Sequence, residues 1–202
     1  MTEREIGQAP GELALVQAFV NTRDVGQATD ELSGPAALSG WLAGAGLLPG
    51  PAPLAGEADL ALAVGIREAL RAVLRAHAGH GLADAAASEL DAAAAGLATR
   101  LEAGPDGRIR VIAAGAGIGP ALARLLLIAA EAGTAGTWPR LKACSADDCQ
   151  WAFYDRSPTR NGCWCSMQIC GSRAKSRAYR RRSAANGPAT ASRSGRTAAR
   201  GA

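Results

Sequence analysis

The feature that most constrains this chain is a set of four regularly spaced cysteines near one end. Cys144 and Cys149 form one C-x4-C pair, Cys165 and Cys170 form a second, and 15 residues separate the pairs. Two short loops that each supply two thiolates can converge on one tetrahedral metal ion. The pattern predicts a structural Zn²⁺ site with these four ligands, and iron–sulfur ligation remains an alternative.

A fifth cysteine, Cys163, stands two residues before Cys165. One zinc ion takes four ligands, and the symmetry of the two pairs makes Cys163 the residue left over. It is either an incidental thiol or a redox-reactive neighbour of the metal. The first residues show no secretory signal and no apolar run is long enough to span a bilayer, so we expect a cytoplasmic protein with reduced thiols and no membrane partner.

The segment that follows the last cysteine pair is strongly basic. Residues 171–182 carry six positive side chains and no negative one. Arginines recur there at helical spacing, and such a stripe favours a polyanion as partner. We therefore predict DNA contacts by Arg173, Lys175, Arg177, Arg180, Arg181 and Arg182. Between the cysteine pairs, Trp151 and Phe153 alternate as on a short strand with one face covering the metal site.

Charge divides the chain into two parts. Residues 1–139 carry 9 Lys and Arg against 15 Asp and Glu, whereas residues 140–202 carry 13 against 3. An acidic body followed by a basic segment suggests an acidic domain, or one that binds a soluble ligand, joined to a polyanion-binding one. We place a helical domain at 11–139, a zinc finger at 140–182 and a disordered basic tail at 183–202, because the tail has no large apolar residue.

Hydrophobic spacing predicts a mainly α fold with a small β element. We expect helices over residues 33–48, 59–78, 83–101 and 120–132, a strand over 108–112, and either a strand or a short helix over 14–22. Pro49, Pro51 and Pro53 predict a stiff connector. In the helix over 59–78, leucines and isoleucine follow a 3.6-residue period, and the polar side is formed by Arg67, Glu68, Arg71 and Arg75.

Other motifs do not indicate catalysis. The only histidines, His77 and His80, fit surface positions at the end of a helix. The string RIRVIAAGAGIGPALARLLL has Pro120 where a dinucleotide fingerprint needs glycine, so a turn before an amphipathic helix is the better interpretation. No Ser/His/Asp or Cys/His arrangement is evident. We therefore expect a protein that is not an enzyme.

The cysteine-rich segment resembles a known family. The string CSADDCQWAFYDRSPTRNGCWCSMQICGSRAKSRAYRRR resembles the CGNR zinc finger in its cysteine pairs, its aromatic-and-Asp strand and its basic helix. Upstream, FVNTRD, LSGWLAGAGLL and IREALRAVL are similar to the ABATE domain that accompanies this finger. The resemblance implies a stress-induced bacterial transcription regulator with a sensor-like helical domain and a DNA-binding finger.

The resemblance assigns the zinc positions to the same four cysteines and also shows two departures. Ser172 stands where the family usually has asparagine, and Gly162-Cys163 replaces a usual arginine pair. We expect the serine to spare the fold and the lost arginines to weaken DNA contact through that loop. A zinc-stabilised protein-interaction module and a thiol-based redox sensor remain alternatives. A homodimer and an unknown small-molecule ligand of the helical domain are further possibilities.

Overall fold

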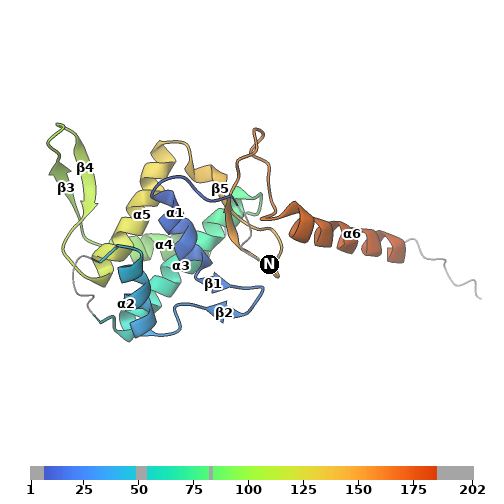
Figure 1. The fold of residues 1–202 in the computed structure, drawn as a ribbon, viewed down its shortest axis with the longest axis horizontal. Coiled ribbons are helices and arrows are strands. Elements are labelled where there is room, and N and C mark those ends of the chain that lie inside the picture. Colours follow the sequence, from blue (N-terminus) through green and yellow to red (C-terminus); the bar gives the residue numbers. More distant parts are fainter. Residues whose placement is uncertain (1–6, 49–53, 82–83, 186–202) are drawn as a thin grey trace, which may run out of the picture.

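A computed structural model describes residues 7–48, 54–81 and 84–185. The protein is mostly helical, with three small two-stranded antiparallel hairpins (Figure 1). The helices are α1 (Leu13–Asn21), α2 (Pro35–Gly44), α3 (Glu57–His77), α4 (Asp84–Ala95), α5 (Ile118–Thr134) and α6 (Ser172–Ala185). The strands are β1 (Arg23–Asp24), β2 (Thr29–Asp30), β3 (Thr99–Ala103), β4 (Ile109–Ala113), β5 (Leu141–Ala143) and β6 (Ala152–Tyr154). The predicted fold class is confirmed.

The core forms around α3, which packs against α1, α2 and α5. Ile66, Leu70 and Leu74 recur every four residues and are fully buried, as the period predicts. Segment 14–22, left open between strand and helix, belongs to α1, where Val16, Phe19 and Val20 are fully buried on one face. No helix among the described residues is long and apolar enough to cross a membrane.

The helix expected over 83–101 is too long. It ends at Ala95, and residues 99–103 instead form β3, which pairs with β4 in the register Leu101↔Val111. The helix ends next to Gly96, which disfavours helical backbone, and α4 buries no residue that would hold a longer helix in place. Leu101, expected to pack in the helix, is 70% exposed on the hairpin.

Two arginines on the polar side of α3 do not face solvent. Arg67 and Arg71 are buried, with exposed fractions of 1% and 2%. Arg67 donates two hydrogen bonds to the Asp30 carboxylate at 2.7 and 2.8 Å. Arg71 donates to the Val20 carbonyl at 2.7 Å. Guanidinium groups present five donors, so they can be buried where carboxylates and backbone carbonyls surround them.

His77 is half-buried and has specific partners, unlike the free surface residue that was expected. Its Nδ1 lies 2.8 Å from the Leu141 carbonyl oxygen, and its ring contacts Trp138 edge-on at 5.4 Å between centroids. Burial lowers the pKa of His77, which favours the neutral imidazole. The residue therefore joins the end of α3 to β5 instead of placing a positive charge at the helix terminus.

The β5–β6 hairpin lies within the main core although it belongs to the cysteine-rich segment. Leu141, Ala143, Ala152 and Tyr154 are buried with the helical residues. From α1, Gln17 and Asn21 both donate to the Ala152 carbonyl, at 3.2 and 3.0 Å. The first strands of the predicted finger are therefore packed on the predicted helical domain.

At the other end of the finger, α6 extends away from the rest of the fold (Figure 1). It continues to Ala185, into the beginning of the tail predicted to be disordered. The remainder of that tail, 186–202, and the proline connector at 49–53 lie outside the described residues.

Candidate metal centre and nucleic-acid interface

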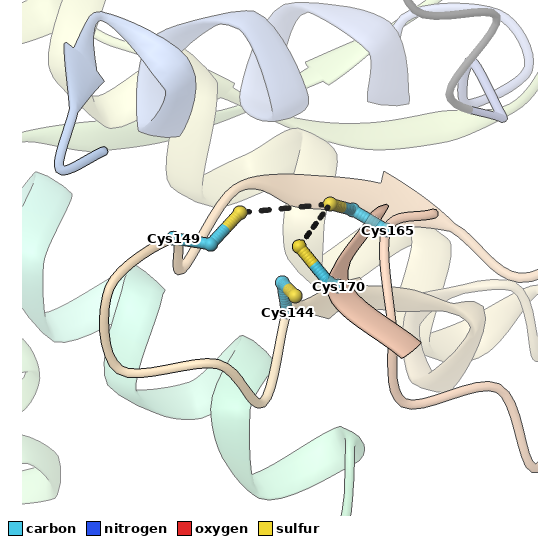
Figure 2. A group of neighbouring side chains, drawn as sticks. All are labelled: Cys144, Cys149, Cys165 and Cys170. Carbon is cyan, nitrogen blue, oxygen red and sulfur yellow. Dashed lines mark hydrogen bonds between the residues drawn. The ribbon is translucent and has the colours of Figure 1, made fainter. Parts of the chain in front are cut away.

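The four paired cysteines come from two loops that meet beside β5 and β6 (Figure 2). Cys144 directly follows β5, and Cys149 lies in the tight turn before β6. Cys165 precedes a short π-helical turn, Met167–Gly171, that contains Cys170 and leads into α6. Backbone bonds fix both loops: the Cys144 N–H donates to the Trp151 carbonyl, and the Cys170 N–H to the Ser166 carbonyl, each at 2.9 Å.

The four sulfur atoms have the separation that a tetrahedral metal site needs. All lie within 4.8 Å of one another, with Cys149–Cys165 at 3.5 Å and Cys165–Cys170 at 3.7 Å (Figure 2). Zn–S bonds of about 2.3 Å in a tetrahedron place the sulfurs about 3.8 Å apart. Four thiols around one point therefore fit Zn²⁺ in both donor chemistry and spacing.

Without a cation, burial and mutual proximity give the four thiols very different tendencies to ionise. Hydrogen bonds from Cys149 and Cys165 lower the pKa of Cys144 to about 2, whereas contacts with Cys144 and Cys149 raise the pKa of Cys165. Burial, with repulsion from the neighbouring sulfurs, raises the pKa of Cys170 to about 12. One thiolate forms readily here and further ones are opposed, so a divalent cation is what would let all four ionise.

Aromatic side chains cover the cysteines, as the sequence predicted for Trp151. Trp151, just before β6, and Trp164 both pack against the cluster. Phe153, in β6, is buried but is not part of this cluster, so the prediction that it also covers the metal site is not confirmed. Gly171 is the last residue of the π-helical turn. A Cβ added there would lie 3.1 Å from the Met167 sulfur, so the turn leaves little room for a side chain.

Cys163 lies outside the cluster of four cysteines. Among the described residues, the group of potential ligands contains the other four cysteines and not this one. The Cys163 backbone has a structural role, since its carbonyl accepts a hydrogen bond from the Ser145 N–H at 2.9 Å. Burial raises the pKa of its thiol, which keeps it protonated and less nucleophilic.

A buried ion pair that the sequence analysis missed holds the long loop between the cysteine pairs. The Lys142 ammonium lies 2.8 Å from the Asp155 carboxylate and also donates to the Gly162 carbonyl at 3.0 Å. Burial opposes ionisation of Asp155, but hydrogen bonds from Lys142 and Ser157 outweigh it and lower its pKa. A Cβ added at Gly162 would lie 3.0 Å from this carboxylate, so glycine suits the position.

Two adjacent acids connect the first cysteine loop to helices on either side. Asp147 pairs with Arg75 at the end of α3 at 2.8 Å. Asp148 faces the other way and lies 3.4 Å from both Arg173 and Arg177 of α6. The sequence showed these acids inside a cysteine loop but gave no sign of their partners, which are distant along the chain.

One face of α6 and the turn before it border a shallow, open groove that contains three arginines. The groove has a volume of about 480 Å³ and is lined by Gln168, Ile169, Ser172, Arg173, Ser176, Arg177 and Arg180. At 100° per residue, Lys175 and Arg182 lie on the opposite side of the helix, and Arg181 lies at its edge. The six basic residues predicted to contact DNA are therefore all on α6, but they do not share one face.

These features define a mostly helical protein that ends in a four-cysteine zinc finger and a basic helix. Residues 140–183 match the CGNR zinc finger. Residues 13–136 match the ABATE family, described as "Putative stress-induced transcription regulator". Because that match spans more than half of the chain, the protein belongs to the ABATE family, and the resemblance seen in the sequence is confirmed. No curated protein matches the chain.

Ser172, which stands where the family usually has asparagine, fits its surroundings without disturbing the start of α6. Ser172, in place of the usual asparagine, donates from its hydroxyl to the Met167 carbonyl at 3.3 Å. This bond ties the first residue of α6 to the π-helical turn that carries Cys170. The serine thus keeps a polar contact at this junction, in line with the expectation from the sequence.

Proposed function

We propose that the chain is a transcription regulator that binds one Zn²⁺ through Cys144, Cys149, Cys165 and Cys170 and binds DNA through α6. The observation that carries the proposal is the join between the two elements. The last zinc ligand lies in the turn that leads directly into α6, so the metal would fix the direction of the basic helix. This role requires no catalysis and fits a cytoplasmic protein.

We propose that the grooved face of α6 meets the duplex. Arg173, Arg177 and Arg180 line it, and Asp148 lies within ion-pair distance of the first two. Guanidinium groups suit bidentate contact with phosphates and with guanine edges. Lys175, Arg181 and Arg182 would then contribute longer-range attraction to the polyanion and not the central contacts.

The test compares two double variants that remove equal charge from opposite faces of the same helix. If Arg177 and Arg180 each neutralise a phosphate, Arg177→Ala with Arg180→Ala should weaken binding on all sequences. It should also flatten the slope of log K against log salt by about 2. Lys175→Ala with Arg182→Ala should flatten the slope by less than about 1. Fluorescence anisotropy with duplex DNA, selected first from a random pool, measures both.

Equal losses in the two double variants would show charge attraction without a defined face. A second candidate function, binding to an acidic protein surface, is favoured by exposed apolar residues in the turn before α6. Met167 and Ile169 are 59% and 40% exposed in this turn, and Ile169 also lines the groove. Absence of any DNA binding by the zinc-loaded wild type at low salt would favour this candidate.

The remaining alternatives have less support. A thiol-based redox sensor would need a reactive thiol, and Cys163 has a raised pKa and lies outside the cysteine cluster. An unknown small-molecule ligand of the helical region remains a prediction from the sequence.

A further inference from the structure

The β3–β4 hairpin projects from the body of the fold (Figure 1). Every residue of β3 is exposed, and among the described strands β3 pairs with β4 alone. Leu101 and Ile109 are 70% and 71% exposed. A two-stranded hairpin is marginally stable by itself in water, so an exposed apolar hairpin of this kind gains from additional strands.

The backbone groups at the open edge of β3 can be identified from the ladder. The Gly104 N–H donates to the Arg108 carbonyl at 2.8 Å, and the Ala114 N–H to the Ala98 carbonyl at 2.9 Å. Because bonded and non-bonded pairs alternate in an antiparallel ladder, the even-numbered residues of β3 bond to β4. The N–H and C=O groups of Thr99, Leu101 and Ala103 therefore point to the open edge, which can accept another strand.

The charged residues on this edge would be complementary to those of a second, antiparallel copy of the same edge. Arg100 and Glu102 flank Leu101 on the same face of the strand. If a second copy pairs antiparallel with Leu101 opposite its own counterpart, each Arg100 faces a Glu102 of the other chain. Neighbouring registers that keep the backbone bonds would place Arg100 opposite Arg100, or Glu102 opposite Glu102, and like charges in those positions are destabilising.

The same register aligns side chains of opposite charge on one face of the four strands and apolar side chains on the other. Glu102 stands opposite Arg110 in the β3–β4 register, so in the dimer it would lie between Arg110 and the Arg100 of the second copy. In the single chain Glu102 forms an ion pair with its own Arg100 at 2.8 Å, and Arg110 pairs with Asp106. On the other face, Leu101 pairs with Val111. The two central leucines would therefore extend into an apolar row with a valine at each end.

We propose that β3 is a homodimerisation edge, and that two copies form a four-stranded antiparallel sheet centred on Leu101. Reciprocal bonds between the two Leu101 backbones, together with those of Thr99 and Ala103, hold the two edges together. The proposal does not depend on zinc or DNA binding, because the edge lies outside the finger and its test uses no DNA.

Sedimentation of the full zinc-loaded chain tests this edge. We expect the wild type to dimerise and Arg100→Glu to weaken the dimer by at least about tenfold, since all facing charges become acidic. Glu102→Arg should weaken it similarly. An equimolar mixture of the two variants should restore dimers, because each arginine then faces a glutamate across the edge.

Two further variants separate the edge from general effects on folding. Leu101→Pro removes an N–H that points to the open edge and leaves the β3–β4 bonds intact, so it should also give monomers. Glu89→Arg, an equal charge reversal on exposed α4, should dimerise like the wild type. A monomeric wild type overturns the proposal, as do unchanged dimers of Arg100→Glu and Leu101→Pro or a mixture that fails to restore dimers.

Discussion

At the scale of single residues, the cysteine cluster raises a problem of charge. Three of its thiols are buried and one is half-buried, and all four sulfurs lie within 4.8 Å. Burial and the close approach of the sulfurs oppose the ionisation of several of these thiols at once. A structural zinc ion would stabilise the four deprotonated thiols together, and its binding free energy would add to the stability of the folded segment.

We expect about one zinc per purified chain, and its loss when any one of the four clustered cysteines is replaced by serine. Serine removes a soft thiolate ligand with almost no change in side-chain size. Cys163→Ser is the matched control, since its thiol lies outside the cluster, and it should keep the full zinc content. Elemental analysis of the purified variants measures this. Retention of zinc by Cys165→Ser together with its loss from Cys163→Ser would refute the ligand set.

At the scale of elements, α3 links most parts of the molecule through three arginines spaced four residues apart. Arg67 binds Asp30 of β2, and Arg71 donates to the Val20 carbonyl and, at 3.0 Å, to the Gln150 carbonyl beside β6. Arg75 binds Asp147 in the first cysteine loop. One face of a single helix therefore orients a hairpin, a turn and the candidate metal loop.

Replacing Arg67 by methionine tests the most buried of these three arginines. The change keeps most of the aliphatic volume but leaves Asp30 and the Thr22 hydroxyl without their guanidinium partner. Arg67 is buried, but the Asp30 side chain is 34% exposed, so water can hydrate it in the variant. Loss of these charge-assisted hydrogen bonds should therefore lower the free energy of unfolding by about 2 kcal/mol. Urea unfolding of the zinc-loaded protein measures it.

Arg124→Ala serves as the control for this loss. Arg124 pairs with Glu12 on the surface, where both side chains are about half exposed. A surface pair contributes little, so this variant should lose less than about 1 kcal/mol. Similar losses for the two arginines would show that burial of Arg67 does not determine its contribution.

These elements also show how far the sequence could predict the structure. Periodicity located α2, α3 and α5 because their apolar residues face one core, and spacing predicted the meeting of the four cysteines. The polarity of Arg67 and Arg71 indicated solvent, since nothing local reveals that Asp30 and distant carbonyls enclose them. The pairing of Lys142 with Asp155 likewise depends on a contact that the sequence around neither residue reveals.

At the scale of the whole molecule, the finger and the helical region share part of their structure. The β5–β6 hairpin is packed into the helical core, whereas α6 and the π-helical turn lie outside it. The core residues of α1, α2, α3 and α5 include no cysteine. Zinc would therefore control the outer part of the finger, while the hairpin stays attached to the helices.

Removing the metal tests this division. Chelation should leave most of the helical circular dichroism intact, because the core around α3 is held by buried apolar residues and internal ion pairs. The segment from Cys144 to Gly171 should open, since its loops depend on the ion, and α6 should lose its fixed direction.

Limited trypsin digestion should then cut first at Arg156, Arg160 and Arg173, which the zinc-loaded protein should protect more strongly. A Cys144→Ser, Cys165→Ser double variant should resemble the chelated wild type and be unaffected by the chelator. Loss of nearly all helical signal on chelation would instead show that metal site and helical core unfold as one cooperative unit, joined through β5, β6 and the arginines of α3.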